Sequence, residues 1–227
     1  MNKSLQEHVP DAESRYYCDG RAVDDCWKNM DKAFLLRLLV AKYDYKSYLE
    51  IGCRHDTTYK QIDVPRKVGV DPVSGGTFRG TSDQFFSASK DKFDLIFVDG
   101  LHEHEQVLRD VRNGLDALNS NGTIVLHDCL PKDAAAAAYP QGSAPFWNGT
   151  VYRAVAQLRR DPSIDVVTLD ADWGLAVVRQ RPNTDLLISL PSTPLTFADY
   201  LSNRDEIMRV VRSLDALIDW LDKDVDL

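Results

Sequence analysis

Apolar residues occur along the chain in short uninterrupted runs, and segments with helical spacing separate these runs. Four of the runs predict β-strands, and they lie at 47–52 (SYLEIG), 67–71 (KVGVD), 94–99 (DLIFVD) and 123–128 (TIVLHD). Between the last two, Val107, Val111, Leu115 and Leu118 follow one another at intervals of four, four and three residues, which predicts a helix over 103–118. Strands that are apolar on both faces and alternate with helices are typical of a parallel sheet.

Further elements surround these strands. We expect helices at 24–42, 54–62, 83–88, 149–160 and 204–222, a turn at 119–122, a long loop at 129–148, a short element at 77–81 (TFRGT), and strands at 164–169 and 173–178. Three residues separate the last two strands, too few for a helical crossover, so they should form an antiparallel hairpin at the sheet edge. The sequence therefore predicts an α/β fold. It would be a doubly wound, mostly parallel seven-stranded Rossmann-like sheet with an antiparallel last strand, plus N- and C-terminal helices.

The length of 227 residues suits one such domain with appendages. We place an N-terminal segment and helix at 1–44, the α/β domain at 45–180, and a connector with a helix at 181–227. The net charge of −8 disfavours a surface that binds nucleic acid. No apolar stretch is long enough to span a membrane and residues 1–19 lack a signal sequence, so we expect a cytoplasmic protein. The four scattered cysteines are expected to be reduced thiols.

Acidic residues stand at the carboxyl ends of the four predicted parallel strands. The strands end in Glu50 with Gly52, in Asp71, in Asp99, and in Asp128. Ligands bind outside the carboxyl ends of strands in open parallel sheets, so we expect these residues to gather on one rim around a ligand. The alternative is that each acid only caps the helix that follows it.

The segments YLEIG, KVGVD, DLIFVDG and GTIVLHD resemble the class I S-adenosylmethionine-dependent methyltransferases. More narrowly, GTSDQFF, DGLHEHEQV, LHDCLP, WNG and DWG resemble a small-molecule O-methyltransferase subgroup, methyltransferase family 24, over roughly residues 45–180. The resemblance implies methyl transfer from S-adenosylmethionine to a small-molecule hydroxyl, on a sugar or a secondary metabolite. Two alternatives stay open: a hydroxylase-like enzyme on the same scaffold, and a non-catalytic module that binds S-adenosylmethionine.

The same resemblance implies where the cofactor lies. Glu50 and Gly52 would contact its methionine part, Asp71 would accept hydrogen bonds from both ribose hydroxyls, and Ser82 or Asp83 would lie beside the adenine. A carboxylate can accept from two neighbouring donors, and a glycine allows close approach of its backbone to a ligand.

The loop after the first strand departs from the family pattern, because Gly52 is the single glycine that remains of its glycine-rich motif. Arg54 is a candidate partner for the methionine carboxylate of the cofactor, or a solvated residue at the start of a helix. The sequence leaves this choice open.

Two histidines are candidate bases for the acceptor hydroxyl, because an imidazole can be neutral and accept a proton near pH 7. His102 follows Asp99 by three residues, and His127 precedes Asp128. Asp99 and Asp128 follow strands expected to be neighbours, so they could bind one divalent cation such as Mg²⁺. His127 or Cys129 would then supply a third ligand, although neither is ideal for magnesium. Without a cation, Asp99 would contact the cofactor or orient His102.

The loop at 129–148 is long enough to be a lid over the acceptor. Its aromatic residues Tyr139, Phe146 and Trp147 would either cover the acceptor or pack the loop onto the last helix. Trp173 is expected in the core. The C-terminal helix would dock on its own domain or on a second subunit, so a homodimer is a further hypothesis.

Overall fold

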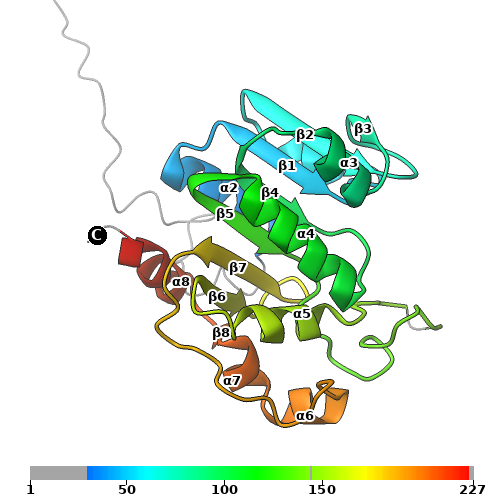
Figure 1. Ribbon diagram of the computed structural model, residues 1–227, viewed down its shortest axis with the longest axis vertical. Helices are drawn as coiled ribbons and strands as arrows, with labels where there is room; N and C mark the ends of the chain where they lie inside the picture. The colour runs from blue at the N-terminus through cyan, green and yellow to red at the C-terminus, as the bar shows by residue number, and fades with distance from the viewer. Residues whose placement is uncertain (1–29, 144, 225–227) are drawn as a thin grey trace, which may run out of the picture.

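A single sheet of eight strands organises the fold in the computed structural model, which describes residues 30–143 and 145–224 (Figure 1). Its strand order is β3-β2-β1-β4-β5-β7-β6-β8. The strands are β1 (Ser47–Ile51), β2 (Arg66–Asp71), β3 (Phe78–Arg79), β4 (Phe93–Val98), β5 (Leu118–Leu126), β6 (Ile164–Leu169), β7 (Leu175–Gln180) and β8 (Val210–Val211). The expectations for residues 1–29, including Cys18 and Cys26, lie outside the described residues.

The strand directions confirm a mostly parallel, doubly wound sheet. Strand β1 pairs in parallel with β2 on one side and with β4 on the other, and β4 pairs in parallel with β5. Strand β7 runs antiparallel to both β5 and β6, as the short β6–β7 connection predicts. The hairpin is not at the edge of the sheet, however, because Val210 and Val211 pair in parallel with Thr168 and Leu169 of β6 as an additional strand.

Helices cover both faces of the sheet (Figure 1). Their bounds are α2 (Lys32–Tyr43), α3 (Ser82–Ala88), α4 (His104–Asp116), α5 (Val151–Leu158), α6 (Phe197–Ser202), α7 (Arg204–Met208) and α8 (Leu214–Leu221), with short 3-10 helices η3 (Tyr59–Gln61) and η4 (Asp222–Asp224). Successive side chains of β4 point to opposite faces, so Leu95 and Phe97 pack in a core with α2 and α8, whereas Ile96 and Val98 pack with α4 and α5. Burial on both sides explains why these strands have no polar face.

Two segments differ from the expected helices because the backbone turns within them. Residues 54–62 form turns and η3 instead of a regular helix, since Arg54 and Asp56 have φ angles of 46° and 61°, outside the range of a right-handed helix. The apolar stripe at 204–222 is divided into α7, β8 and α8. Arg209, with φ 47°, ends α7, and the Ser213 hydroxyl caps α8.

The expected turn at 119–122 is instead an irregular part of β5. The register between β4 and β5 shifts between Phe93 and Leu95, and Asn121 has a φ of 62°.

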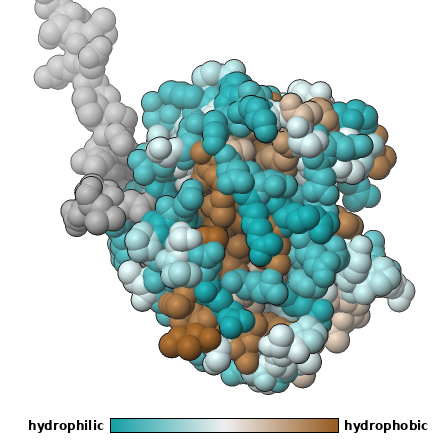
Figure 2. All heavy atoms as spheres, viewed as in Figure 1, coloured by the Kyte–Doolittle hydropathy of each residue, from teal (hydrophilic) through white to brown (hydrophobic). Residues whose placement is uncertain are grey.

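Figure 2 shows that hydrophilic residues cover most of the face with α4 and α5, although apolar patches are visible on it. In the described part of the chain, none of the helices combines the length and the apolar character that crossing a membrane requires.

Candidate active site

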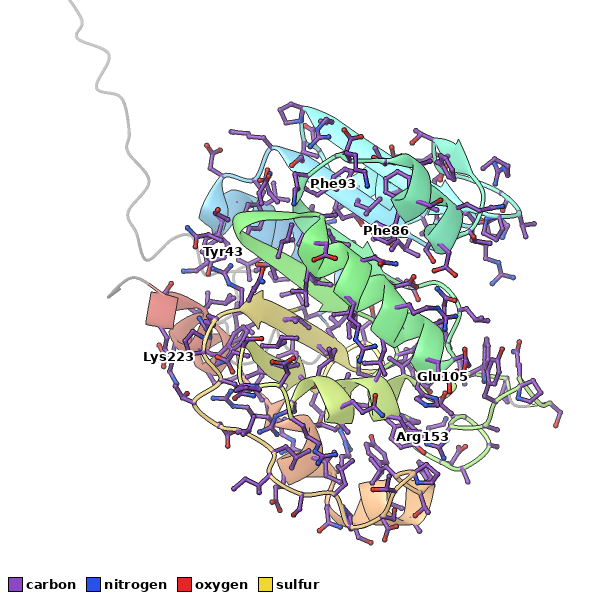
Figure 3. All side chains as sticks on the ribbon, in the orientation of Figure 1. Tyr43, Phe86, Phe93, Glu105, Arg153 and Lys223 are labelled. Carbon is purple, nitrogen blue, oxygen red and sulfur yellow. The ribbon has the colours of Figure 1, made fainter. Side chains whose placement is uncertain are left out.

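The acids at the strand ends lie along the carboxyl edge of the parallel part of the sheet. Glu50 is the fourth residue of β1, Asp71 ends β2, Asp99 follows β4, and Asp128 lies two residues beyond β5. These strands are parallel and adjacent in the order β2-β1-β4-β5, so the four positions share one edge. In Figure 3, Phe93 marks the start of β4, and Glu105, in the first turn of α4, marks the opposite edge, where β4 ends.

Glu50 is a buried carboxyl group in the middle of this edge. It lies between Gly69 of β2 and Phe97 of β4, and its residue surface is 2% exposed. The Tyr48 hydroxyl donates a hydrogen bond to Glu50 Oε2 at 2.5 Å. Burial disfavours the charged form and raises the pKa of Glu50 to about 7, against the effect of the Tyr48 hydrogen bond. Glu50 can therefore stabilise a cationic group that approaches the end of β1.

A glycine is required at position 52 because the backbone at the end of β4 packs directly against it. Its φ is 94°, and a Cβ atom at this position would lie 2.1 Å from the carbonyl oxygen of Asp99. The end of β4 therefore approaches the turn after β1 more closely than any side chain allows. The expected close approach of a ligand is not needed to explain the glycine.

The Asp71 carboxylate already binds the two loops beside it. Its Oδ2 accepts from the Arg54 backbone N–H at 2.9 Å, and its Oδ1 accepts from the backbone N–H groups of Val73 and Ser74 at 2.7 and 2.8 Å. Burial opposes ionisation, but these hydrogen bonds outweigh it and lower the pKa of Asp71. A carboxylate has about four acceptor positions, so this arrangement leaves room for one ribose hydroxyl, not the expected two.

Ser82 and Asp83 begin α3 next to this loop. Thr81 caps the helix in a reciprocal arrangement with Gln84. Gln106 of α4 donates to the Ser82 hydroxyl and to Asp83 Oδ1, at 3.2 Å in each case. Ser82 is buried and Asp83 is exposed, so the two expected adenine contacts offer different environments. The side chain of Arg54 is exposed at the same loop.

Asp99, His102 and Asp128 converge at the neighbouring position on the edge. His102 Nε2 lies 3.5 Å from Asp99 Oδ1 and 3.4 Å from Asp128 Oδ2. The other ring nitrogen, Nδ1, lies 2.9 Å from the Trp147 carbonyl oxygen. A carbonyl oxygen can only accept, so Nδ1 carries a proton and Nε2 faces the two carboxylates.

His127 is held more tightly between carboxylates. Its Nδ1 lies 2.9 Å from Asp128 Oδ2 and 3.2 Å from Asp99 Oδ1, and its Nε2 lies 3.5 Å from Asp172 Oδ1. Burial alone would lower the pKa of His127, but the three surrounding aspartates raise it to about 11.

Cys129, the other residue expected to supply a third metal ligand, faces away from the carboxylates. It is fully buried, and its Sγ lies 3.5 Å from the carbonyl oxygens of Leu126 and His127. Asp128 has a φ of 59°, so the backbone turns at this residue and the side chains of Asp128 and Cys129 point in different directions. The donor atoms that do converge belong to Asp99, His102 and Asp128, all within 4.8 Å of one another, and this spacing fits a single cation. His102, rather than His127 or Cys129, completes this donor set.

The sequence interpretation missed three residues at this edge. Lys32, the first residue of α2, places its Nζ 2.6 Å from Asp99 Oδ2, and its backbone N–H donates to Asp172 Oδ2 at 2.7 Å. Asn148 Nδ2 donates to Asp128 Oδ1 at 2.8 Å. Asp172 and Asn148 belong to the DWG and WNG segments, and these segments could have indicated that both residues lie at the site. Nothing in the sequence near Lys32 indicates that its side chain reaches Asp99.

Aromatic rings from the 129–148 loop lie over this cluster. Trp147 stacks on His102 with ring centroids 4.9 Å apart, and Tyr139 stacks on Trp147 at 6.1 Å. Phe146 stacks on Trp173 at 4.7 Å. Trp173 is half-buried in the turn before β7, with a φ of 64°, so the expectation that it belongs to the core is wrong. Tyr139 and Phe146 are 44% and 51% exposed, so the loop presents aromatic surface beside the cluster.

Residues 50–129, which contain the whole set of strand-end acids, match the model of methyltransferase family 24, described as a methyltransferase domain. The match places a methyltransferase domain in this part of the chain. Its sheet is that of a class I S-adenosylmethionine-dependent methyltransferase, with the antiparallel strand β7 inserted beside β5. The match is to methyltransferases, so it gives no support to a hydroxylase-like activity.

Solved structures agree with this fold. An SAH-bound methyltransferase from Podospora anserina is 19% identical, with a TM-score of 0.53 over 76% of this chain and 89% of that chain. A putative O-methyltransferase from Klebsiella pneumoniae is 16% identical, with a TM-score of 0.53 over 78% and 84%. A putative caffeoyl-CoA O-methyltransferase from Staphylococcus aureus is 16% identical, with a TM-score of 0.51 over 66% and 83%. No curated protein matches the sequence.

Proposed function

We propose that this methyltransferase transfers the methyl group of S-adenosylmethionine to a hydroxyl group of a small molecule, a sugar or a secondary metabolite. The observation that carries the proposal is the convergence of Glu50, Asp71, Asp99 and Asp128 on one edge of a methyltransferase domain, with His102 Nε2 facing two of them. Open α/β sheets bind ligands at this edge.

The cofactor would lie across the ends of β1 and β2. Glu50 is a buried carboxyl group beside the turn at Gly52, so it is suited to the cationic methionine end of the cofactor. Asp71 would accept one ribose hydroxyl through its remaining acceptor position, and Ser82 or Asp83 would contact the adenine. A cofactor product, SAH, is bound in the Podospora anserina structure, which has the same fold.

The reaction is an in-line displacement. The acceptor oxygen forms a bond to the methyl carbon while the bond between that carbon and sulfur breaks, and sulfur keeps the electron pair. S-adenosylhomocysteine (SAH) is the neutral product at sulfur, and the hydroxyl proton of the acceptor passes to a basic atom of the group formed by Asp99, His102 and Asp128. Positioning of donor and acceptor supplies much of the rate in such a reaction, so the rigid strand ends matter as much as the proton acceptor.

The acceptor hydroxyl would be activated at the group formed by Asp99, His102 and Asp128. His102 is the better placed of the two candidate histidines, because both nitrogens of His127 lie against aspartates inside the protein and its residue surface is 7% exposed. Asp99 and Asp128 would hold a divalent cation such as Mg²⁺, and a bound cation supplies a Lewis acid that lowers the pKa of the acceptor hydroxyl.

The 129–148 loop would cover the acceptor. Trp147 contacts His102 directly, and the exposed rings of Tyr139 and Phe146 lie in the same loop. Aromatic faces pack against rings of sugars and of secondary metabolites alike, which supports a small cyclic acceptor. With an acceptor bound, the loop would also shield the edge from water, and this would favour transfer to the acceptor over side reactions.

Isothermal titration calorimetry with SAH tests the proposed cofactor site. We expect SAH to bind the wild-type protein with one site per chain, and Asp71→Ala to abolish binding. Asp91→Ala is the matched control, because Asp91 is an exposed aspartate in the segment before β4, at the opposite edge of the sheet. The proposal is wrong if SAH fails to bind the wild-type protein, or if the two variants bind it equally.

The reaction itself is tested with S-adenosylmethionine that carries an isotopically labelled methyl group and a panel of hydroxylated sugars and secondary metabolites. Mass analysis of the products should place the label on an oxygen atom. A label on nitrogen or sulfur of an acceptor would contradict transfer to a hydroxyl.

A further inference from the structure

We infer that His102 is the third protein ligand of a divalent transition-metal ion that Asp99 and Asp128 hold. The inference rests on the proposed function, because it assigns the way in which that same site activates the acceptor. It departs from the expectation of magnesium, since an imidazole nitrogen replaces a third oxygen ligand.

The first argument is the spacing of the donor atoms. His102 Nε2 lies 3.5 Å from Asp99 Oδ1 and 3.4 Å from Asp128 Oδ2. These separations are longer than the 2.7–3.2 Å of an ordinary N–H···O hydrogen bond. Donors that surround one tetrahedral ion at bond lengths of about 2.0–2.2 Å lie roughly 3.4 Å apart. The three atoms therefore have the separation of ligands around an ion.

The second argument is the orientation of the imidazole. The Trp147 carbonyl oxygen, 2.9 Å from Nδ1, fixes the proton on Nδ1, so the lone pair of the neutral ring is on Nε2. That lone pair faces the two carboxylate oxygens. Histidines that bind metals usually donate their other N–H to a carbonyl or a carboxylate in this way. The stacked ring of Trp147 further holds the imidazole plane, with an angle of 28° between the two rings.

The third argument is that a polar side chain from elsewhere in the chain binds one oxygen of each of the two carboxylates, the oxygen that faces away from His102. Lys32 Nζ binds Asp99 Oδ2, and Asn148 Nδ2 binds Asp128 Oδ1. The oxygens left for an ion are Asp99 Oδ1 and Asp128 Oδ2, the same atoms that face His102. His127 Nδ1 also contacts both, but a carboxylate oxygen has two lone pairs and can bind a donor and an ion together.

A fourth observation comes from Asn148, which is fully buried. Its amide nitrogen binds Asp128, whereas its amide oxygen Oδ1 has no hydrogen-bond partner among the described residues. An unpartnered buried acceptor calls for a water or an ion that supplies a partner. A water bound to the metal ion would supply the missing donor.

The donor set decides which ion is preferred. Carboxylate oxygens alone suit Mg²⁺ and Ca²⁺, whereas imidazole nitrogen suits Zn²⁺ and Fe²⁺, and Mn²⁺ accepts both. Two carboxylates and one imidazole therefore favour Mn²⁺, Fe²⁺ or Zn²⁺ over Mg²⁺. Lys32 and His127 already offset part of the charge of the three carboxylates that gather here, Asp99, Asp128 and Asp172, so the preference for an ion rests on the donor atoms and not on net charge.

The test uses the full-length protein, freed of metal with a chelator and titrated with Mn²⁺ alone, which electron paramagnetic resonance detects. We expect one Mn²⁺ per chain, with Mg²⁺ competing only at about tenfold or greater excess. The electron spin-echo modulation of bound Mn²⁺ should show coupling to an imidazole nitrogen. His102→Gln should remove this coupling and weaken Mn²⁺ binding by about tenfold or more. His104→Gln, two residues further along the chain, is the matched control and should change neither.

Several results would overturn the inference. These are the absence of Mn²⁺ binding by the wild-type protein, bound Mn²⁺ without nitrogen coupling, and coupling that persists in His102→Gln. If circular dichroism shows that His102→Gln folds poorly, His127→Gln decides instead, because His127 is the other imidazole beside these carboxylates and its replacement should leave the nitrogen coupling unchanged. Loss of the coupling in a folded His127→Gln variant would also overturn the inference. SAH calorimetry separates the two proposals: SAH binding without Mn²⁺ binding refutes the metal site alone, and Mn²⁺ binding with nitrogen coupling but without SAH binding refutes the proposed function alone.

Discussion

Replacement of Glu50 by glutamine tests the electrostatics of the buried edge. Glu50 is 2% exposed, and burial raises its pKa from 4.5 to about 7. Because the folded protein holds this proton more tightly than the unfolded chain, the stabilisation is fully present below pH 4.5 and is lost as pH rises through 7. The difference between the two pKa values corresponds to about 3 kcal/mol in the free energy of unfolding, and solvent screening is small for a group this deeply buried.

The Glu50→Gln side chain has the same size, stays neutral at every pH, and still offers an oxygen to the Tyr48 hydroxyl. The variant should therefore lose the pH dependence that Glu50 contributes. Relative to the wild-type protein, its free energy of unfolding should rise by up to about 3 kcal/mol between pH 4.5 and pH 8. Urea unfolding followed by circular dichroism, at intervals of half a pH unit, measures this difference.

Glu105→Gln is the control for removal of one negative charge, because Glu105 is exposed on the first turn of α4 (Figure 3). It should show no comparable change across this range. The reasoning would be refuted if the free energies of unfolding of Glu50→Gln and the wild-type protein differed by the same amount at every pH from 4.5 to 8.

Three further predictions concern the backbone around the site. Gly52→Ala should lower the free energy of unfolding by about 3 kcal/mol, measured by urea unfolding, because its Cβ would lie 2.1 Å from the Asp99 carbonyl oxygen at a φ of 94°; an unchanged stability would contradict this. Asp71→Ala should cost about 2 kcal/mol or more in the same assay, since it leaves three backbone N–H groups without their acceptor, and a loss below 0.5 kcal/mol would count against it. Trp147→Ala should increase amide hydrogen exchange in the 129–148 loop, because it removes the stack on His102, whereas equal exchange rates would show that the stack does not hold the loop.

The strands and the edge that they form could be predicted from the sequence because the signals are local. The runs that end in Glu50, Asp71, Asp99 and Asp128 are apolar on both faces, and the parallel order follows from the helices between them. Helix breaks were harder to predict. The stripe at 204–222 has helical spacing throughout, and the left-handed conformation at Arg209 leaves no mark in the hydrophobic pattern.

The contacts within the site could be predicted only in part, because they join distant parts of the chain. Lys32 reaches Asp99 from α2, and its backbone contacts Asp172 across 140 residues. The orientation of the His102 ring depends on the Trp147 carbonyl, 45 residues further along. Residue types and strand ends indicated which side chains matter. The sequence left His127 and Cys129 open as the third ligand, and the φ of 59° at Asp128, which orients Cys129, could not be predicted from it.

The most direct measurement is a crystal structure of the protein with SAH. The nucleoside should lie at the carboxyl ends of β1 and β2, with a ribose hydroxyl within hydrogen-bond distance of Asp71 and the amino-acid end of SAH beside Glu50. SAH bound at any other surface, or a ribose that does not contact Asp71, would contradict the account.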